Sequence, residues 1–350
     1  MTQRWVYDRA PLRIYWEITR ACDLACRHCR AAAAARPDPR ELTTAEGMRL
    51  IEQLARFRTP LPHLVLTGGD PLKRADLFEL IDTAVTLGFG VSVSPSATPL
   101  LTPAAIQALK CAGVEAISLS MDGSTPERHD AIRGIAGTFA RTVEAARAAA
   151  RVDLMYQVNT LVAAETLDDL PAIYDVVREL GAARWSLFFL VSVGRGTVLQ
   201  QISAEQCEVV MRWISDLAGR AGPVVTTTEA PHFRRIVRQL RPAQGGGHAA
   251  GVRDGNGVMF ISHTGDITPA GFLPVVAGNV RADDPAGVYR DSPLFQQLRQ
   301  PDGFGGRCGR CEFRWMCGGS RARAYAATGN VAAEDPLCDY EPRVLAKSLS

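Results

Sequence analysis

RIYWEITRACDLACRHC, residues 13–29, is the stretch that decides how this chain folds. Its first part, Arg13–Ile18, is rich in apolar and aromatic residues and predicts a buried strand. Its second part places three cysteines, Cys22, Cys26 and Cys29, in the spacing C-x3-C-x2-C directly after that strand. Such a group at the carboxyl end of a strand indicates a metal-ligand set at the edge of a sheet where ligands bind.

Beyond this stretch, five further strand-like runs alternate with amphipathic helical segments. The expected strands are Leu64–Thr67, Gly90–Ser94, Ala116–Met121, Leu154–Val162 and Arg184–Val191. Thr43 and Glu46 form a capping box at the start of one helical segment. Six strand–helix units in strict alternation predict a parallel sheet, and six are too few for a complete eight-fold barrel. The expected fold class is therefore α/β, with a partial (βα)6 TIM-type barrel over residues 1–200.

The rest of the chain predicts a helical linker region over residues 201–245 and a small α+β domain over residues 246–350. The small domain begins with an expected hairpin of Val258–Ser262 and Asp266–Ala270. Cys207 lies in an apolar helical stripe and Cys111 at a helix end, so we expect both in the core. The alanine run 31–35 is expected to be helical.

Composition limits the classes of function. The 350 residues are 47% hydrophobic and 22% charged, which is ordinary for a soluble globular protein. A net charge of +2 gives no reason to expect nucleic acid or an anionic membrane surface as a partner. No apolar run is long enough for a membrane span, and the N-terminus lacks the apolar core of a signal peptide. We therefore expect a cytoplasmic protein, whose nine cysteines are metal ligands or core residues and not disulfides.

The cysteine triplet, with the His28 ring before its last member, resembles the signature of the radical S-adenosylmethionine (SAM) superfamily, and the resemblance covers nearly the whole chain. Three thiolates leave one iron of a 4Fe–4S cluster open, whereas four close it. The resemblance implies that the open iron binds SAM and that one electron cleaves SAM to a 5′-deoxyadenosyl radical. A zinc site or an incomplete ferredoxin motif is the alternative for the triplet alone.

Other strand ends match the same superfamily. Gly68-Gly69-Asp70-Pro71 corresponds to its GGE-type motif at the end of the second strand, where glycine permits close approach to a ligand. Ser94-Pro95-Ser96, after the third strand, departs from the usual S-T-N-G and leaves the role of these serines open. The resemblance implies SAM contacts from His28, Gly68, Gly69, Asp70, Pro71, Ser120, Asp122, Arg133, Asn159 and Leu190.

A second cysteine group, Cys308, Cys311, Cys317 and Cys338, resembles the SPASM extension, which usually holds two auxiliary 4Fe–4S clusters. Here Ala270 and Arg321 stand where ligands of the inner auxiliary cluster are expected. All four ligands of the outer cluster are present. The resemblance therefore implies one auxiliary 4Fe–4S cluster with four cysteine ligands and a role in electron transfer. A structural zinc site remains the alternative.

The segments Gly271–Pro274 and Ala277–Val280 resemble the subgroup that remodels haem side chains, including the makers of haem b and dioxo-haem, within a family that also contains the mycofactocin-type maturases. The leading hypothesis is a radical SAM oxidoreductase that oxidises or decarboxylates a tetrapyrrole, with a flavodoxin or ferredoxin as electron donor. A ribosomal-peptide maturase is the alternative, although no peptide-recognition domain precedes the first strand. A non-catalytic iron–sulfur carrier or zinc scaffold is the third hypothesis, and it does not explain why the triplet and GGDP occur together.

No catalytic acid or base stands out from the sequence. The candidates are Arg195, Glu229, His232 and His263, with Asp254 as a further titratable group. Arg234, Arg238 and Arg241 share one helix face, which is either a carboxylate-binding face or a solvated basic one.

Overall fold

The computed structural model describes residues 7–57, 60–217, 220–241 and 251–343. Its strands form one ten-stranded sheet in the order β10-β9-β8-β1-β2-β3-β4-β5-β6-β7. The strands are β1 (Arg13–Thr19), β2 (His63–Gly68), β3 (Val91–Val93), β4 (Ala116–Ser120), β5 (Met155–Val162), β6 (Arg184–Phe189), β7 (Val224–Thr228), β8 (Val258–Ile261), β9 (Asp266–Thr268) and β10 (Gly278–Asn279).

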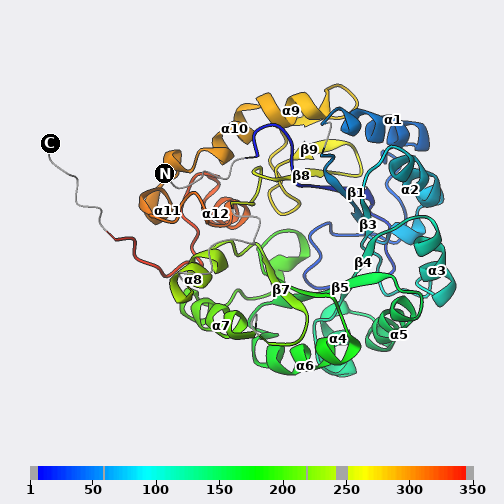
Figure 1. The fold of residues 1–350 in the computed structure, drawn as a ribbon, viewed down its shortest axis with the longest axis horizontal. Coiled ribbons are helices and arrows are strands. Elements are labelled where there is room, and N and C mark those ends of the chain that lie inside the picture. Colours follow the sequence, from blue (N-terminus) through cyan, green and yellow to red (C-terminus); the bar gives the residue numbers. More distant parts are fainter. Residues whose placement is uncertain (1–6, 58–59, 218–219, 242–250, 344–350) are drawn as a thin grey trace.

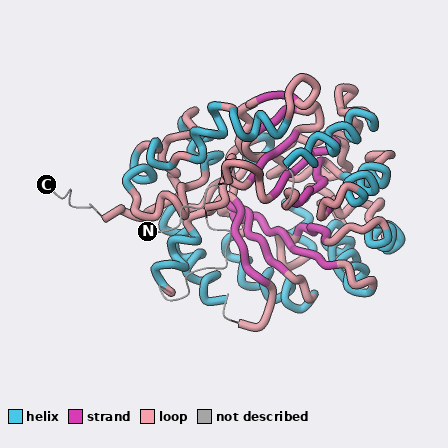
Figure 2. Tube along the Cα trace, turned by 45° about the horizontal axis from the view of Figure 1, so that its top comes forward, coloured by secondary structure: helices cyan, strands magenta, loops and turns pink. Residues whose placement is uncertain are grey.

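Eight neighbouring strands, from β8 through β1 to β7, are parallel and curve into an incomplete barrel. Figure 2 shows the strands inside and the helices around them. The α/β fold with a parallel, partial TIM-type barrel is thus confirmed. In the described residues β7 pairs only with β6, and β9 and β10 add an antiparallel extension beyond β8.

The helices follow the strands along the chain and form the outer layer. They are α1 (Thr44–Leu54), α2 (Leu77–Thr86), α3 (Pro103–Cys111), α4 (Pro126–Arg133), α5 (Thr138–Arg151), α6 (Leu170–Leu180), α7 (Ala204–Leu217), α8 (Phe233–Leu240), α9 (Pro285–Asp291), α10 (Pro293–Arg299), α11 (Gly306–Arg310) and α12 (Arg321–Thr328). Short 3-10 helices cover Ala55–Phe57, Pro71–Lys73, Leu167–Asp169, Gly194–Val198 and Pro301–Gly303. The capping box of Thr43 and Glu46 is present at the start of α1.

The core lies between the sheet and these helices. On β1, Ile14, Trp16 and Ile18 are fully buried in the main apolar cluster. Because side chains alternate along a strand, Glu17 and Thr19 face the inside of the barrel. The segment from α9 to α12 occupies the side of the ring between α1 and α8 (Figure 1). The sequence thus places apolar groups outside the sheet and polar groups inside it.

Two features of the sheet differ from expectation. A seventh parallel strand, β7, forms inside the region expected to be a helical linker, because Val224–Thr228 pairs in register with β6. The expected hairpin of β8 and β9 is confirmed, yet β8 also pairs in parallel with β1, so the small domain continues the barrel sheet. The expected domain boundary at 245 and 246 lies outside the described residues.

Two local expectations are wrong. Residues 31–35 are not helical: Ala32 has φ of 46° and Ala34 forms an isolated bridge with Ala21, so the run wraps around the cysteine loop. Cys111 is exposed, because α3 buries Ile106 and Leu109 on a different face. Cys207 is fully buried, as expected.

Candidate active site

The cysteine triplet lies on the loop that leaves the carboxyl end of β1. Cys22 and Cys26 are buried and Cys29 is half-buried, and together they form one small cluster with their neighbours. Main-chain N–H groups point at two of the sulfurs: Leu24 donates to the Cys22 Sγ at 3.4 Å, and Ala33 donates to the Cys29 Sγ at 3.4 Å. Such donors stabilise thiolates that ligate a metal.

Arg195 holds this loop in shape. Its backbone N–H donates to the Cys29 carbonyl at 3.0 Å, and its guanidinium donates to the carbonyls of Cys26 and Ala33, each at 3.0 Å. The residue follows β6 and therefore reaches the loop from across the barrel mouth. The structure thus places this catalytic candidate beside the triplet, where it supports the loop backbone.

The GGDP turn at the end of β2 packs directly on the same loop. Gly69 donates its N–H to the Thr19 carbonyl at 2.8 Å, and Asp70 donates its N–H to the Ala21 carbonyl at 2.7 Å. A Cβ at Gly69 would lie 2.3 Å from the Ala21 oxygen, well inside contact distance. Glycine is therefore required here because two backbones meet.

The Asp70 carboxylate is fully buried and is satisfied by the protein itself. It accepts from the Leu72 N–H at 3.2 Å, the Ser96 N–H at 3.3 Å and the Thr98 hydroxyl at 2.7 Å. Burial raises the pKa of this carboxyl above its ordinary value. The Ser96 hydroxyl also lies 3.5 Å from the Cys22 Sγ, so the loop after β3 links Asp70 to the triplet. Sequence reasoning found Asp70 but not its partner Thr98.

The next group lies where β4 ends. Asp122 and Arg133 form an ion pair of 2.5 Å, and the Arg133 guanidinium reaches the Cys26 Sγ at 3.6 Å. Asp122 also accepts the Leu161 N–H at 2.7 Å. Burial alone would raise the pKa of Asp122, but the Arg133 guanidinium holds it below its usual value of 3.8. A buried charged pair thus stands against the second thiol of the triplet.

Three other predicted SAM contacts lie on neighbouring strands. Ser120 on β4 is in register with Asn159 on β5. The Asn159 side chain accepts from Gln157 at 2.9 Å. The Leu190 carbonyl, after β6, accepts from Arg323 of α12 at 3.3 Å. Asn159 and Leu190 thus already make hydrogen bonds within the protein, and Ser120 is placed by its strand register alone.

The residues around the triplet fit a polar cofactor. Among the described residues, the buried Nδ1 of His28, Nη2 of Arg195 and Nε of Arg133 have no hydrogen-bond partner. Burial first, and the cations of Arg133 and Arg195 next, lower the pKa of His28 to about 4, although Asp122 opposes this shift. The His28 ring is therefore neutral at physiological pH. The unused arginine donors suit a carboxylate, and a neutral imidazole can accept from an amino group, so these residues beside three thiols match a ligand that carries both groups.

The second cysteine group forms its own site about α11. The thiols of Cys308, Cys311, Cys317 and Cys338 line one cavity. Three arginines, Arg235, Arg307 and Arg314, line the same cavity. Main-chain N–H groups again face the sulfurs, with Asp335 donating to Cys308, Phe313 to Cys311 and Gly319 to Cys317, each at 3.4 Å. The four thiols predicted as one ligand set are therefore brought together.

Burial raises the pKa of the Cys22, Cys311 and Cys317 thiols, and that of Cys338 to about 11. Thiols in such positions ionise when a metal binds, with release of protons. No three His, Cys, Asp or Glu side chains in the described ranges converge on one ion position. A cubane does not require that convergence, because each cysteine ligates a different iron.

The two departures from the SPASM pattern are both buried. Ala270 packs in a small apolar cluster with Val191, Leu273 and Leu298. Arg321 donates to the Val331 carbonyl at 3.1 Å and to the Cys308 Sγ at 3.5 Å. The Ala270 methyl group and the Arg321 guanidinium thus occupy the positions where ligands of the inner auxiliary cluster are expected, and neither group ligates iron.

Glu229 and His232 lie between the barrel and the second cysteine group. Glu229, at the end of β7, has φ of 57° and accepts from the Ser320 hydroxyl. His232 is fully buried, with its Nε2 at 3.2 Å from the Cys207 Sγ and its Nδ1 at 4.0 Å from Asp335. Burial lowers the pKa of His232 to about 4. The structure does not bring His232 to the triplet.

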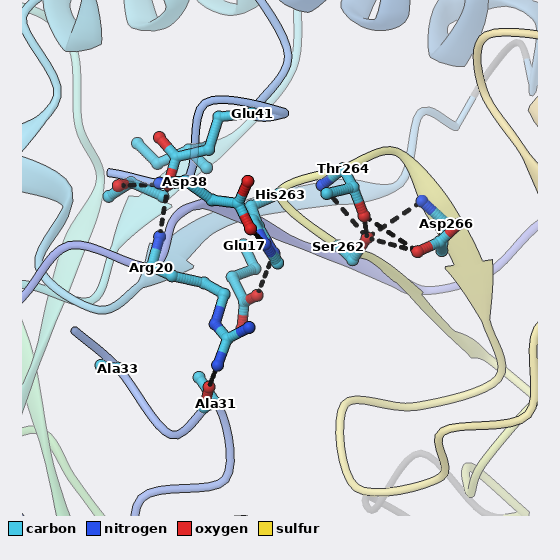
Figure 3. A network of polar contacts seen from close by, with 12 residues as sticks. Glu17, Arg20, Ala31, Ala33, Asp38, Glu41, Ser262, His263, Thr264 and Asp266 are labelled. Atoms are coloured by element: carbon cyan, nitrogen blue, oxygen red, sulfur yellow. Dashed lines mark hydrogen bonds and ion pairs between the residues drawn. The ribbon is translucent and has the colours of Figure 1, made fainter. Parts of the chain in front are cut away.

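His263 belongs to a buried network that joins β1 to the β8–β9 turn (Figure 3). Its Nδ1 lies 2.8 Å from the Glu17 carboxylate, and its Nε2 lies 3.5 Å from Asp38. Glu17 also accepts from Arg30, the residue after the triplet, at 2.6 Å. Burial would raise the pKa of Glu17, but Arg30 and His263 lower it below 4.5. This network attaches the hairpin to the cysteine loop.

The basic helix face is not free to bind a carboxylate at two of its three positions. The Arg234 guanidinium donates to the carbonyls of Val252 and Met316, and Arg241 donates to the Ser215 carbonyl at 2.9 Å. These arginines fasten α8 to neighbouring segments.

Comparison with known proteins agrees with this geometry. The family model of the Radical SAM superfamily matches residues 16–177, from β1 into α6. Since relatives more than 30% identical also span nearly the whole chain, the chain belongs to the radical SAM superfamily of enzymes. Membership implies a 4Fe–4S cluster and SAM as cofactors.

Those relatives are both AdoMet-dependent heme synthases. The protein from Oleidesulfovibrio alaskensis is 39% identical, over 94% of this chain and 87% of its own. The protein from Methanosarcina barkeri is 37% identical, over 95% of this chain and 97% of its own.

Among solved structures, SuiB of Streptococcus suis bound to S-adenosylmethionine superposes with a TM-score of 0.74 at 17% identity, over 95% of this chain and 78% of its own, and shows the shared fold. In the part of the chain that the structure describes, no helix is long and apolar enough to cross a membrane.

Proposed function

We propose that this radical SAM enzyme oxidises or decarboxylates a tetrapyrrole of the haem-precursor type. The observation that supports this substrate class is the nearly full-length identity of 39% and 37% to two AdoMet-dependent heme synthases. These alignments cover 94% and 95% of the chain, so they include most of the region outside the barrel. Haem precursors bear propionate side chains, and removal of one hydrogen atom and one further electron from a propionate releases carbon dioxide and leaves a vinyl group.

We assign the catalytic cluster to Cys22, Cys26 and Cys29. When bound, this cluster supplies the electron that cleaves SAM to a 5′-deoxyadenosyl radical. The chain contributes the rest: Arg195 fixes the carbonyls of the loop, and Arg133 supplies a guanidinium next to Cys26. The neutral His28 and the unused donors beside it are suited to hold the amino-acid part of SAM.

We assign one auxiliary 4Fe–4S cluster to the second cysteine group. Four thiols around one cavity support it, and Ala270 and Arg321 argue against an inner cluster. With four cysteine ligands no iron is open to substrate, which favours electron transfer. A flavodoxin or ferredoxin is the proposed electron donor, on the resemblance to the family.

The test is turnover by the anaerobically reconstituted full-length protein with SAM, dithionite and an iron porphyrin that bears propionates. We expect 5′-deoxyadenosine, carbon dioxide and a porphyrin with one or more propionates converted to vinyl groups, all detected by mass spectrometry. The variant with Cys22, Cys26 and Cys29 changed to alanine is the control and should give none of them. SAM cleavage with no change in any porphyrin, but with modification of a peptide, would reject the tetrapyrrole proposal.

A further inference from the structure

The second cysteine group has a fixed positive charge beside one sulfur. Arg321 is the first residue of α12, and its side chain is 0% exposed. Its Nη2 lies 3.5 Å from the Cys308 Sγ, its Nε donates to the Gly319 carbonyl at 3.3 Å, and its Cζ lies 4.5 Å from the centre of the Phe304 ring. These contacts hold the guanidinium in one orientation, behind the cavity wall and against the Cys308 sulfur.

This charge is not neutralised by an ion pair. Among the described residues, the acceptors of Arg321 are main-chain carbonyls and the Cys308 sulfur, and no carboxylate lies within ion-pair distance of it. Asp335, a buried carboxylate that also lines the cavity, is paired instead with Arg323 at 3.3 Å. Because guanidinium stays protonated in proteins, Arg321 is a permanent local cation.

Arg235, which lines the cavity beside a different sulfur, provides a comparison. Its Nη2 lies 3.9 Å from the Cys338 Sγ, farther than Arg321 lies from Cys308. Arg235 is ion-paired with Glu208, and it lies over the Tyr340 ring at 4.6 Å. Arg235 therefore has a direct ion-pair partner, whereas Arg321 has none among the described residues and interacts with the buried carboxylates of Asp335 and Asp254 only at longer range.

We propose that Arg321 raises the reduction potential of the auxiliary cluster and thereby makes that cluster an electron acceptor. The inference rests on the auxiliary cluster of the proposed function. In the proposed reaction the electron would come from the substrate radical, which would be oxidised by one electron as its carboxylate leaves as carbon dioxide. Accepting that electron would add one negative charge to the cluster without a change in its ligands. A buried cation and an N–H···S hydrogen bond both favour the more negative state, and both act strongly at low dielectric. Arg321 is thus a positioning residue for electron transfer, in the place where other family members have an iron ligand.

The test uses the full-length chain with Cys22, Cys26 and Cys29 changed to alanine, so that only the second site holds iron. The potential is measured by redox titration followed by electron paramagnetic resonance. Arg321→Gln should make reduction at least tenfold less favourable, a shift of about 59 mV for a one-electron couple. Arg321→Lys, which keeps the charge, should restore most of the difference. Arg235→Gln should shift the potential less than Arg321→Gln.

Arg299→Gln is the matched control. Arg299 is also a buried arginine of the C-terminal half, and it donates to the carbonyls of Asp8 and Tyr289 but to no sulfur in the described residues. Its loss should leave the potential unchanged. An unchanged potential in Arg321→Gln with the iron content intact would overturn this inference but leave the proposed auxiliary cluster standing. A larger shift in Arg235→Gln than in Arg321→Gln would do the same. Zinc in the wild-type site would overturn the auxiliary cluster and this inference together.

A measurement on protein with the native Arg321 keeps the inference testable if Arg321→Gln fails to fold. In the Arg235→Gln variant, which removes the other guanidinium hydrogen-bonded to a sulfur of this site, isotopically labelled arginine should show magnetic coupling between a guanidinium nitrogen and the reduced cluster in pulsed electron paramagnetic resonance. Absence of that coupling in a reduced, fully loaded cluster would overturn the inference.

Discussion

At the scale of single residues, substitution of Asp70 distinguishes two roles for the carboxylate of the GGDP motif: stabilising the fold and binding SAM directly. Its carboxylate accepts three hydrogen bonds from the protein, so Asp70→Ala leaves three donors without this partner, of which the Thr98 hydroxyl is buried and the other two are half-buried. We expect a loss of unfolding free energy of about 1–3 kcal/mol, measured by urea denaturation. Thr98→Val, which removes one of the three donors, should cost less. Unchanged stability together with lost SAM affinity would instead show that the carboxylate acts on SAM directly.

Glu229 predicts a dependence of stability on pH. Burial first, and the nearby Asp254 next, raise the pKa of Glu229 well above 4.5, and burial also raises that of Asp254. The folded protein therefore holds more protons than the unfolded chain above pH 4.5, so its stability falls as pH rises toward the raised pKa. Glu229→Gln should flatten this decline in the midpoint of thermal unfolding.

The control for this pH profile is Glu52→Gln, a change of the same chemistry at an exposed position on α1. It should leave the slope as in the wild-type protein. Parallel curves for Glu229→Gln and the wild type would contradict the assigned shift.

At the scale of elements, the candidate active site depends on the close backbone contact between the turn after β2 and the cysteine loop after β1. Gly69→Ala would place a methyl group 2.3 Å from the Ala21 oxygen. That oxygen belongs to the backbone, so it cannot move away as the end of a flexible side chain could. We therefore expect the loop to move, with reduced iron bound by the triplet and weaker SAM binding, measured by iron analysis and by equilibrium dialysis.

Gly303→Ala is the control for this joint, because nothing lies within 4 Å of the added Cβ. It should bind iron and SAM as the wild type does. If Gly69→Ala binds both normally as well, the two loops do not need their close approach.

Local patterns predict elements, but they do not predict which distant elements pair. The strands β1 to β6 follow from buried apolar runs and end within about two residues of the observed bounds. Strand β7 was missed because VVTTT is short and ends in three threonines that are only half-buried. The pairing of β8 with β1 joins Arg13 to Val258, far apart in the sequence, and the contact of His263 with Glu17 spans 246 residues.

At the scale of the whole molecule, the sequence predicts the two ligand sets because cysteine spacing is a local property. It does not predict the charges around them. The sequence shows only that Arg321 stands where a cysteine ligand is expected. Its contact with Cys308 depends on how α12 is placed relative to α11. Likewise Arg195 is a catalytic candidate by position, and only the folded loop shows that it holds the carbonyls of Cys26 and Ala33.

The number of metals in the molecule tests the assignment of both sites together. Seven cysteines in two sets should bind two cubane clusters, hence about eight irons per chain after anaerobic reconstitution. The variant with the triplet changed to alanine should keep about four irons and an iron–sulfur absorption band, because the second set lies about α11 and shares no ligand with the first. It should also form no 5′-deoxyadenosine. Iron analysis with zinc analysis distinguishes the outcomes: about four irons with one zinc per wild-type chain would make the second site structural. About twelve irons would show that residues other than cysteine complete an inner cluster near Ala270, against the apolar packing seen there.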